Sequence, residues 1–401
     1  MQKIHGAKLL VLLLLAILLI SFFASFFTAE NFIFKHSPKD FFFGVSYGQI
    51  SAEQAKPLID KVKDYTNVFI IDSWDITANQ TALNEVCNYC VAANLQFIVY
   101  FQFISRIIFP WHQIWLDTAK QQWGNNFLGI YLQDELGGMQ IDGNLTGNPL
   151  EKSIIKTVSN ATSYTDAAKK FVNTIESANS TLDAKKRGIP LFIGDYALHW
   201  FDYKGGYDTV LAELGWNFST PQQIALVRGA ATLQGKDWGT IVTWKYQQAP
   251  YMPNASEIYS GLVSSYIAGA KYTFIFNYPT YPANNPYGVL SDEDFAVMKQ
   301  FWYYVNTFPR ETYRVQSAKV AFVLPSDYGS PLRRSNDWIW GLWPADSKAS
   351  FILNNTNLLV DKYGLRLDIV YDDARFNVTN KYAQVFYWNS TLDLAWSSSL
   401  Q

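Results

Sequence analysis

The sequence of 401 residues has few cysteines and histidines, the side chains that most often build metal centres. Its two cysteines, Cys87 and Cys90, lie in one helix-like segment with neither a second cysteine pair nor neighbouring histidines. This pattern argues against a zinc site. It fits two buried, small apolar side chains, with a local disulfide as the alternative. The four histidines form no spaced pair, so we expect no metal centre.

Charge and nucleotide-binding motifs are also scarce. Charged residues make up 16% of the chain, the formal net charge is -2, and no basic run occurs. These features argue against a nucleic-acid partner. No Gly-x-Gly-x-x-Gly turn follows a strand-like segment, and no Gly-Lys-Ser/Thr motif or Gly-x-Ser-x-Gly elbow is present. We therefore expect no nucleotide cofactor and no serine nucleophile of the elbow type.

The most apolar segment is residues 9–27, which follows Lys3 and Lys8. A membrane-spanning helix needs roughly 17–25 such residues. A cleaved signal peptide is the alternative, but the positions before Ala24 and Ala29 lack the usual pair of small residues. We expect residues 1–29 to be a signal anchor and residues 30–40 a linker. The basic residues before the span place the bulk of the chain outside the cell, as a single-pass membrane protein.

Potential N-glycosylation sites agree with that orientation. Although serine and threonine are common enough here for several to arise by chance, the number of Asn-x-Ser/Thr triplets fits an extracellular glycoprotein. They begin at Asn79, Asn144, Asn160, Asn179, Asn217, Asn254, Asn354, Asn377 and Asn389.

Strand-like and helix-like segments alternate over residues 41–310. Eight parallel strands alternating with helices are typical of a TIM (β/α)8 barrel. An open doubly wound sheet is the alternative, but it lacks the expected glycine-rich turn. The expected strands cover residues 41–48, 67–74, 96–102, 127–135, 190–196, 208–215, 239–246 and 271–278.

A smaller α/β unit is expected at residues 317–401. Strand-like segments at 319–325, 367–371 and 382–388 and a helix-like segment at 350–363 make a Rossmann-like layer.

The fourth strand ends in Gln133-Asp134-Glu135, followed by two glycines. Alternation along a regular strand places Tyr131, Gln133 and Glu135 on the inner face, so Glu135 is expected to point into the barrel mouth. Asp134 is expected to point away from it. The alternative is that Glu135 only caps the following loop.

Cleavage of a glycosidic bond needs a proton donor and a second carboxylate. Glu135 is the expected donor, and Asp195, which ends the fifth strand, is the expected base or nucleophile. Asp72 and Glu213 are reserves. Each of these acids could instead cap a helix or bind loop amides.

Aromatic residues make up 17% of the chain, including 14 Trp and 25 Tyr, and can stack on the flat faces of sugars. An aromatic-rich core is the alternative. Lys245 is expected either to bind a carboxylated sugar or to form a salt bridge to Glu135 or Asp195. The residues near expected strand ends, which we predict to line a carbohydrate-binding cleft, are Tyr47, Trp74, Tyr100, Gln102, Trp200, Trp244, Lys245, Asn277 and Tyr278.

A barrel with Gln133-Asp134-Glu135 on its fourth strand, followed by a small α/β unit, resembles glycoside hydrolases of the barrel clan. The second unit is similar to the amidotransferase-like domain of thermophilic beta-galactosidases, where it serves assembly. The resemblance implies that Glu135 is the acid/base glutamate. The clan's nucleophile is a glutamate ending the seventh strand, but here that strand ends Thr243-Trp-Lys-Tyr-Gln247, without a carboxylate.

The sequence therefore predicts an extracytoplasmic glycoside hydrolase that acts on a polysaccharide or surface glycan through two carboxylates. The alternative is a non-catalytic glycan-binding or cell-envelope scaffold protein on an enzyme-derived barrel, which the missing carboxylate of the seventh strand favours.

Overall fold

The computed structural model describes residues 40–48, 51–101, 109–143, 155–279, 285–313 and 315–392. The expected signal anchor, the linker up to residue 39, Gln102 and the triplet at Asn144 lie outside these residues. Across the described ranges, no helix has both the length and the apolar character needed to cross a membrane.

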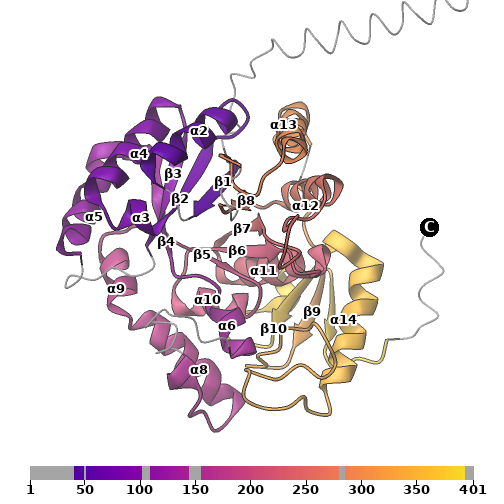
Figure 1. Ribbon diagram of the computed structural model, residues 1–401. Helices are drawn as coiled ribbons and strands as arrows, with labels where there is room; N and C mark the ends of the chain where they lie inside the picture. Colours follow the sequence, from indigo (N-terminus) through magenta and orange to yellow (C-terminus); the bar gives the residue numbers. More distant parts are fainter. Residues whose placement is uncertain are drawn as a thin grey trace, which may run out of the picture. The chain divides into compact units, whose positions relative to one another are not determined.

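Eight parallel strands close into a barrel, because β1 pairs with both β2 and β8 (Figure 1). The TIM barrel expected from the sequence is confirmed, and the strand ends differ from the expected ones by a few residues. The strands are β1 (Phe42–Gly48), β2 (Val68–Asp72), β3 (Gln96–Phe101), β4 (Phe127–Leu132), β5 (Leu191–Asp195), β6 (Thr209–Leu214), β7 (Asp237–Val242) and β8 (Tyr272–Asn277).

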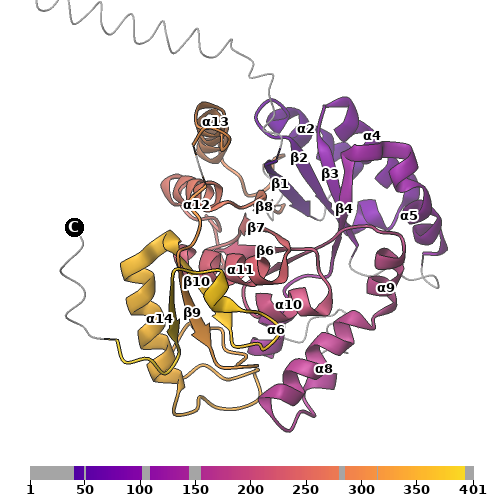
Figure 2. The same cartoon turned by 180° about the vertical axis from the view of Figure 1, so that it is seen from behind.

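Helices form a layer around the barrel (Figures 1 and 2). Five of them, α3, α5, α6, α9 and α10, were not expected from the sequence. Both α6 and α10 have seven residues, which is too short for a helical period to show. The helices that follow the barrel strands are α2 (Ala52–Val62), α3 (Trp74–Thr77), α4 (Gln80–Ala92), α5 (Pro110–Trp123), α6 (Leu136–Asp142), α8 (Tyr164–Glu176), α9 (Asn179–Lys186), α10 (His199–Gly205), α11 (Thr220–Gln234), α12 (Ala255–Ala268) and α13 (Asp292–Thr307).

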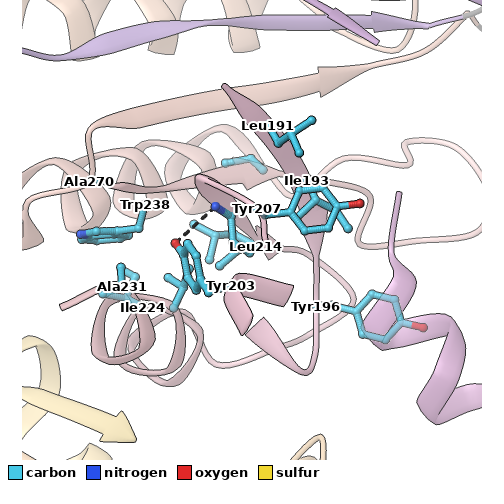
Figure 3. Packing of buried hydrophobic residues seen from close by; sticks show 14 of the residues in the cluster. Leu191, Ile193, Tyr196, Tyr203, Tyr207, Leu214, Ile224, Ala231, Trp238 and Ala270 are labelled. Atoms are coloured by element: carbon cyan, nitrogen blue, oxygen red, sulfur yellow. Dashed lines mark hydrogen bonds between the residues drawn. The ribbon is translucent and has the colours of Figure 1, made fainter. Parts of the chain in front are cut away.

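Strand alternation produces two apolar cores. The inner one fills the barrel with Tyr131, Phe192, Leu211 and their neighbours, whereas the outer one joins strands to helices. Figure 3 shows part of the outer core, which includes Leu191, Ile193 and Leu214 of the strands and Ile224 and Ala231 of α11. Cys87 and Cys90 are free and buried in this outer layer, as one of the two sequence-based interpretations expects.

A second, three-stranded parallel sheet has the order β10-β9-β11, with β9 (Val320–Leu324), β10 (Leu367–Tyr371) and β11 (Gln384–Tyr387). Together with α14 (Ala349–Tyr363), it confirms the expected strands and helix. Barrel helix α11 packs on β10 (Figure 2). This approach is close because a Cβ on Gly229 would lie 2.6 Å from the carbonyl oxygen of Ile369. The expected boundary between the two units and the likeness to an amidotransferase-like domain stay predictions.

Candidate active site

The chain bends sharply after β4, and the bend sets the candidate site. Gln133 and Glu135 have φ values of 65° and 51°, in the left-handed region that residues other than glycine seldom adopt. The hydroxyl of Tyr207 lies 2.8 Å from the carbonyl oxygen of Leu132 and 3.2 Å from Oε1 of Gln133, which holds the bend. Strand alternation therefore stops at Leu132.

This bend corrects the expected direction of Asp134. The hydroxyl of Tyr131, a residue of the inner core, donates a hydrogen bond to Oδ1 of Asp134. On the neighbouring strand β5, a Cβ on Gly194 would lie 2.2 Å from the Tyr131 hydroxyl oxygen and 3.4 Å from the same carboxylate oxygen. Asp134 thus lies at the mouth with Glu135 because a regular strand no longer separates the two side chains.

The carboxyl groups of Glu135 and of Glu213 on β6 are close enough to shift each other's pKa. Leu211 of the same strand lies in the inner core, so Glu213 shares its inward direction. Burial raises the pKa of Glu135, while its interaction with Glu213 acts in the opposite direction. The pKa of Glu213 is raised mainly by burial, and then by the charges of Glu135, Asp134 and Asp195. Two buried carboxyl groups in contact retain a proton between them and titrate as a pair.

Asp195, the expected base or nucleophile, instead holds the backbone that follows Glu135. Its carboxylate accepts the N–H groups of Gly137 at 2.6 Å, Gly138 at 2.9 Å and Ala197 at 3.0 Å. A Cβ on Gly138 would lie 2.1 Å from the ring of Tyr196, so this approach needs glycine. Both oxygens of Asp195 thus accept backbone hydrogen bonds, as expected if this acid caps a helix or binds loop amides. This geometry does not support the catalytic role expected from the sequence.

A further acid, Asp72, ends β2 on the same side of the barrel. Its Oδ2 accepts a hydrogen bond from Oγ of Ser46 at 2.9 Å, and burial raises its pKa to about 7. Burial and the charge of Asp72 both raise the pKa of Tyr278.

Aromatic side chains continue around this mouth. The ring centroids of Tyr100 and Tyr131 are 5.4 Å apart, and those of Trp244 and Tyr278 are 5.7 Å apart. That Tyr100, Trp244 and Tyr278 line a carbohydrate-binding cleft stays a prediction. Trp74, on α3 after β2, is exposed and contacts Phe109.

Two of the predicted binding residues pack elsewhere. Tyr47 belongs to the outer core, where its hydroxyl lies 3.4 Å from the carbonyl oxygen of Gln54 on α2. Trp200 packs on Tyr371 and Phe376 of the second sheet and its following loop. Both corrections follow from the face of the strand or helix that each residue occupies.

Two others hold local structure. Lys245 pairs with Glu257 of α12 at 2.6 Å, and neither expected partner, Glu135 nor Asp195, is involved. The buried side chain of Asn277 donates to the carbonyl oxygen of Tyr287 at 2.8 Å and accepts the N–H of Val289 at 3.1 Å. Asn277 therefore shapes the loop after β8.

The raised carboxyl pKa values predict higher stability in acid. Burial raises the pKa of Asp72 and of Asp195 to about 7, whereas an unfolded aspartate has a pKa near about 3.9. Between those values the folded protein holds more protons than the unfolded chain, so unfolding free energy falls as pH rises. We expect Tm to be several degrees higher at pH 4.5 than at pH 7.5, measured by calorimetry.

The control for this pH effect is Asp72→Asn, which removes one such carboxyl and should flatten the dependence. A Tm that rises between pH 4.5 and pH 7.5 would contradict the assignment. Surface acids in ion pairs do not affect the comparison between pH 4.5 and pH 7.5. Their pKa values are lowered, so their contribution to the unfolding free energy changes only below about pH 4.

No protein-family profile and no curated protein matches the chain. Among solved structures, alpha-L-fucosidase isoenzyme 2 from Paenibacillus thiaminolyticus is similar at 14% identity and a TM-score of 0.48. That match covers 83% of this chain and 58% of the fucosidase. A family 1 β-glucosidase from Thermotoga maritima matches at 8% identity and a TM-score of 0.42, over 67% of this chain and 98% of the glucosidase.

A barrel enzyme of another chemistry is also similar. Orotidine 5'-monophosphate decarboxylase from Methanocaldococcus jannaschii matches at 10% identity and a TM-score of 0.33, covering 68% of this chain and 100% of that enzyme. Because one barrel fold carries many reactions, these likenesses do not extend to an activity. The functional argument rests on the side chains at the mouth.

Proposed function

We propose that the protein is a glycoside hydrolase whose two catalytic carboxyl groups are Glu135 and Glu213. The observation that carries this proposal is that these two acids converge at the carboxyl ends of β4 and β6, where the charge of Glu135 helps to raise the pKa of Glu213. Active sites of TIM barrels are built at that end of the strands. Glu213, a reserve in the sequence analysis, replaces Asp195 because the oxygens of Asp195 already bind three backbone N–H groups.

The retained proton of the pair defines the two roles. Glu135 is partly exposed and Glu213 is 3% exposed, so Glu135 is better placed to protonate the leaving oxygen of a bound glycan. Glu213, ionised when the proton resides on Glu135, attacks the anomeric carbon and forms a glycosyl ester. Glu135 then takes a proton from the water that hydrolyses this ester.

The contact between the acids favours retention of configuration. Retaining enzymes hold their carboxyl groups about 5–5.5 Å apart, whereas inverting enzymes need roughly 6.5–9.5 Å to admit a water molecule. Two carboxyl groups that shift each other's pKa fit the shorter spacing. The rings of Tyr100, Trp244 and Tyr278 supply apolar faces for the sugar.

The apolar segment at residues 9–27 and the Asn-x-Ser/Thr triplets support an extracytoplasmic location for this activity. In this proposal the chain is anchored by its N-terminal helix and glycosylated, and it acts on a polysaccharide or a surface glycan.

The test is a hydrolysis screen of the full chain, purified in detergent, against a polysaccharide panel. We expect cleavage of at least one glycan and a loss of about 10²–10⁴-fold in Glu135→Gln. Glu85→Gln is the matched control, because that acid is exposed and pairs with Lys56 on the outer helices. Glycan binding without cleavage, unchanged in Glu135→Gln, would instead identify a non-catalytic binding protein.

A further inference from the structure

A cavity of about 470 Å³ lies between α6 and the loop that follows β9. Its size falls within the roughly 300–1,000 Å³ of pockets that hold small molecules. The residues that matter for its chemistry are Asp142, Arg333, Arg334, Asn336, Trp338 and Gly341.

The walls of this cavity are fixed by polar contacts. The guanidinium group of Arg333 donates to both carboxylate oxygens of Asp142, at 3.0 and 2.6 Å. Oδ2 of Asp337 accepts the backbone N–H groups of Arg333 at 2.8 Å and Arg334 at 2.7 Å. Gly341 has a φ of 64°, and a Cβ there would lie 2.3 Å from the carbonyl oxygen of Gln140. The loop is therefore held against α6, and the cavity is formed before any ligand arrives.

Three exposed side chains remain to meet a ligand: Arg334, Asn336 and Trp338. The side chain of Trp338 is 52% exposed, which is unusual for so large an apolar ring. An indole face beside a guanidinium group and an amide suits a sugar, which offers a flat C–H face and a rim of hydroxyl groups. The lining of this cavity includes two arginines and two aspartates, so its formal charges balance and favour a neutral ligand.

The cavity adjoins the candidate active site through α6. Glu135 precedes this helix and Asp142 ends it, a separation of about 10 Å at the helical rise of 1.5 Å per residue. The hydroxyl of Tyr196 donates to Oδ2 of Asp142 at 2.8 Å. The charge of Asp142 is also felt at Glu135. The cavity therefore lies near the mouth, at a distance that a glycan of several sugar units can bridge.

We propose that the cavity is a distal subsite for a neutral glycan chain, with Trp338 as its stacking platform. This inference rests on the proposed function and specifies its substrate class as an oligosaccharide or polysaccharide of neutral sugars. Loss of the Trp338 side chain is then expected to weaken the binding of long substrates and to leave the binding of short ones unchanged.

The experiment measures binding of cellohexaose, mannohexaose and maltohexaose to the full-length Glu135→Gln protein by titration calorimetry, with the corresponding disaccharides alongside. Adding Trp338→Ala should weaken binding of the preferred hexasaccharide by about tenfold or more, because the stacked apolar area is lost. Disaccharide binding at the mouth should not change. Tyr303→Ala, which removes an exposed ring of α13, is the matched control.

The outcomes separate the two proposals. Hexasaccharide binding that depends on Trp338, in a protein whose wild type cleaves nothing, supports the subsite and rejects the hydrolase. Cleavage in the wild type together with equal hexasaccharide affinity in both variants rejects the subsite alone. Failure of all three hexasaccharides to bind rejects the neutral-glycan assignment.

Discussion

Glu213→Gln should lower kcat/KM by about 10³-fold on any glycan that the wild-type protein cleaves, because the variant lacks the nucleophile. Glutamine keeps the size of the side chain and removes a buried carboxyl group, so the barrel should remain folded. The effect should therefore fall on the chemical step and appear in kcat.

The pH profile separates a nucleophile from a structural residue. In the wild type, the acidic limb of kcat/KM reports ionisation of the pair to its reactive form, and the alkaline limb reports loss of the shared proton. Glu213→Gln should remove the acidic limb from its residual activity. On an aryl glycoside with a good leaving group, Glu135→Gln should retain more activity than Glu213→Gln.

Comparison with Glu85→Gln controls for the loss of one carboxylate. That variant should match the wild type in both kcat/KM and Tm. A Glu213→Gln protein that is folded and fully active would remove Glu213 from the mechanism. Activity lost in parallel with cooperative unfolding would assign Glu213 a structural role.

The barrel could be predicted from the sequence because each strand is a short apolar run with a distinct end. Residues such as Val68, Ile70 and Phe69 are buried on both faces of one strand, as parallel strands require. The short helices α6 and α10 could not be predicted, since their starts depend on left-handed residues, Glu135 and Leu198, whose conformation is set by tertiary contacts.

The candidate site could be predicted only in part. Glu135 follows from the end of β4, and the alternation of Thr209, Leu211 and Glu213 along β6 indicates that Glu213 points inward. Asp195 was predicted to be the second catalytic acid, but its oxygens accept hydrogen bonds from backbone N–H groups. These tertiary contacts leave no pattern in the sequence. Lys245 was predicted to end the seventh strand, but β7 ends at Val242, three residues earlier. The chain has left the strand by Lys245, and this side chain pairs with Glu257 of α12.

Arg228→Met should destabilise the whole protein by about 3–5 kcal/mol, because it leaves a buried carboxylate without its partner. Nε of Arg228, on barrel helix α11, donates to Oδ1 of Asp368 on β10 at 2.7 Å, and the two side chains are 5% and 1% exposed. Nη2 also donates to the carbonyl oxygens of Leu365 at 2.8 Å and Leu367 at 2.9 Å. Methionine supplies none of these donors.

Urea unfolding followed by circular dichroism would measure this loss, with Lys271→Met as the control. Lys271 pairs with Asp237 at 2.6 Å, but both side chains are exposed, so that pair should contribute less than about 1 kcal/mol. The double variant Arg228→Met/Asp368→Leu should recover part of the loss, since it removes the unpaired charge together with its partner. Equal stability of Arg228→Met and Lys271→Met would show that the ion pair does not join the barrel to the second sheet. We expect Arg228→Met to unfold in a single cooperative transition at a lower urea concentration than the wild type. That result would mean that the barrel and the second sheet unfold together, since Arg228 links α11 to β10 and to the turn that precedes it.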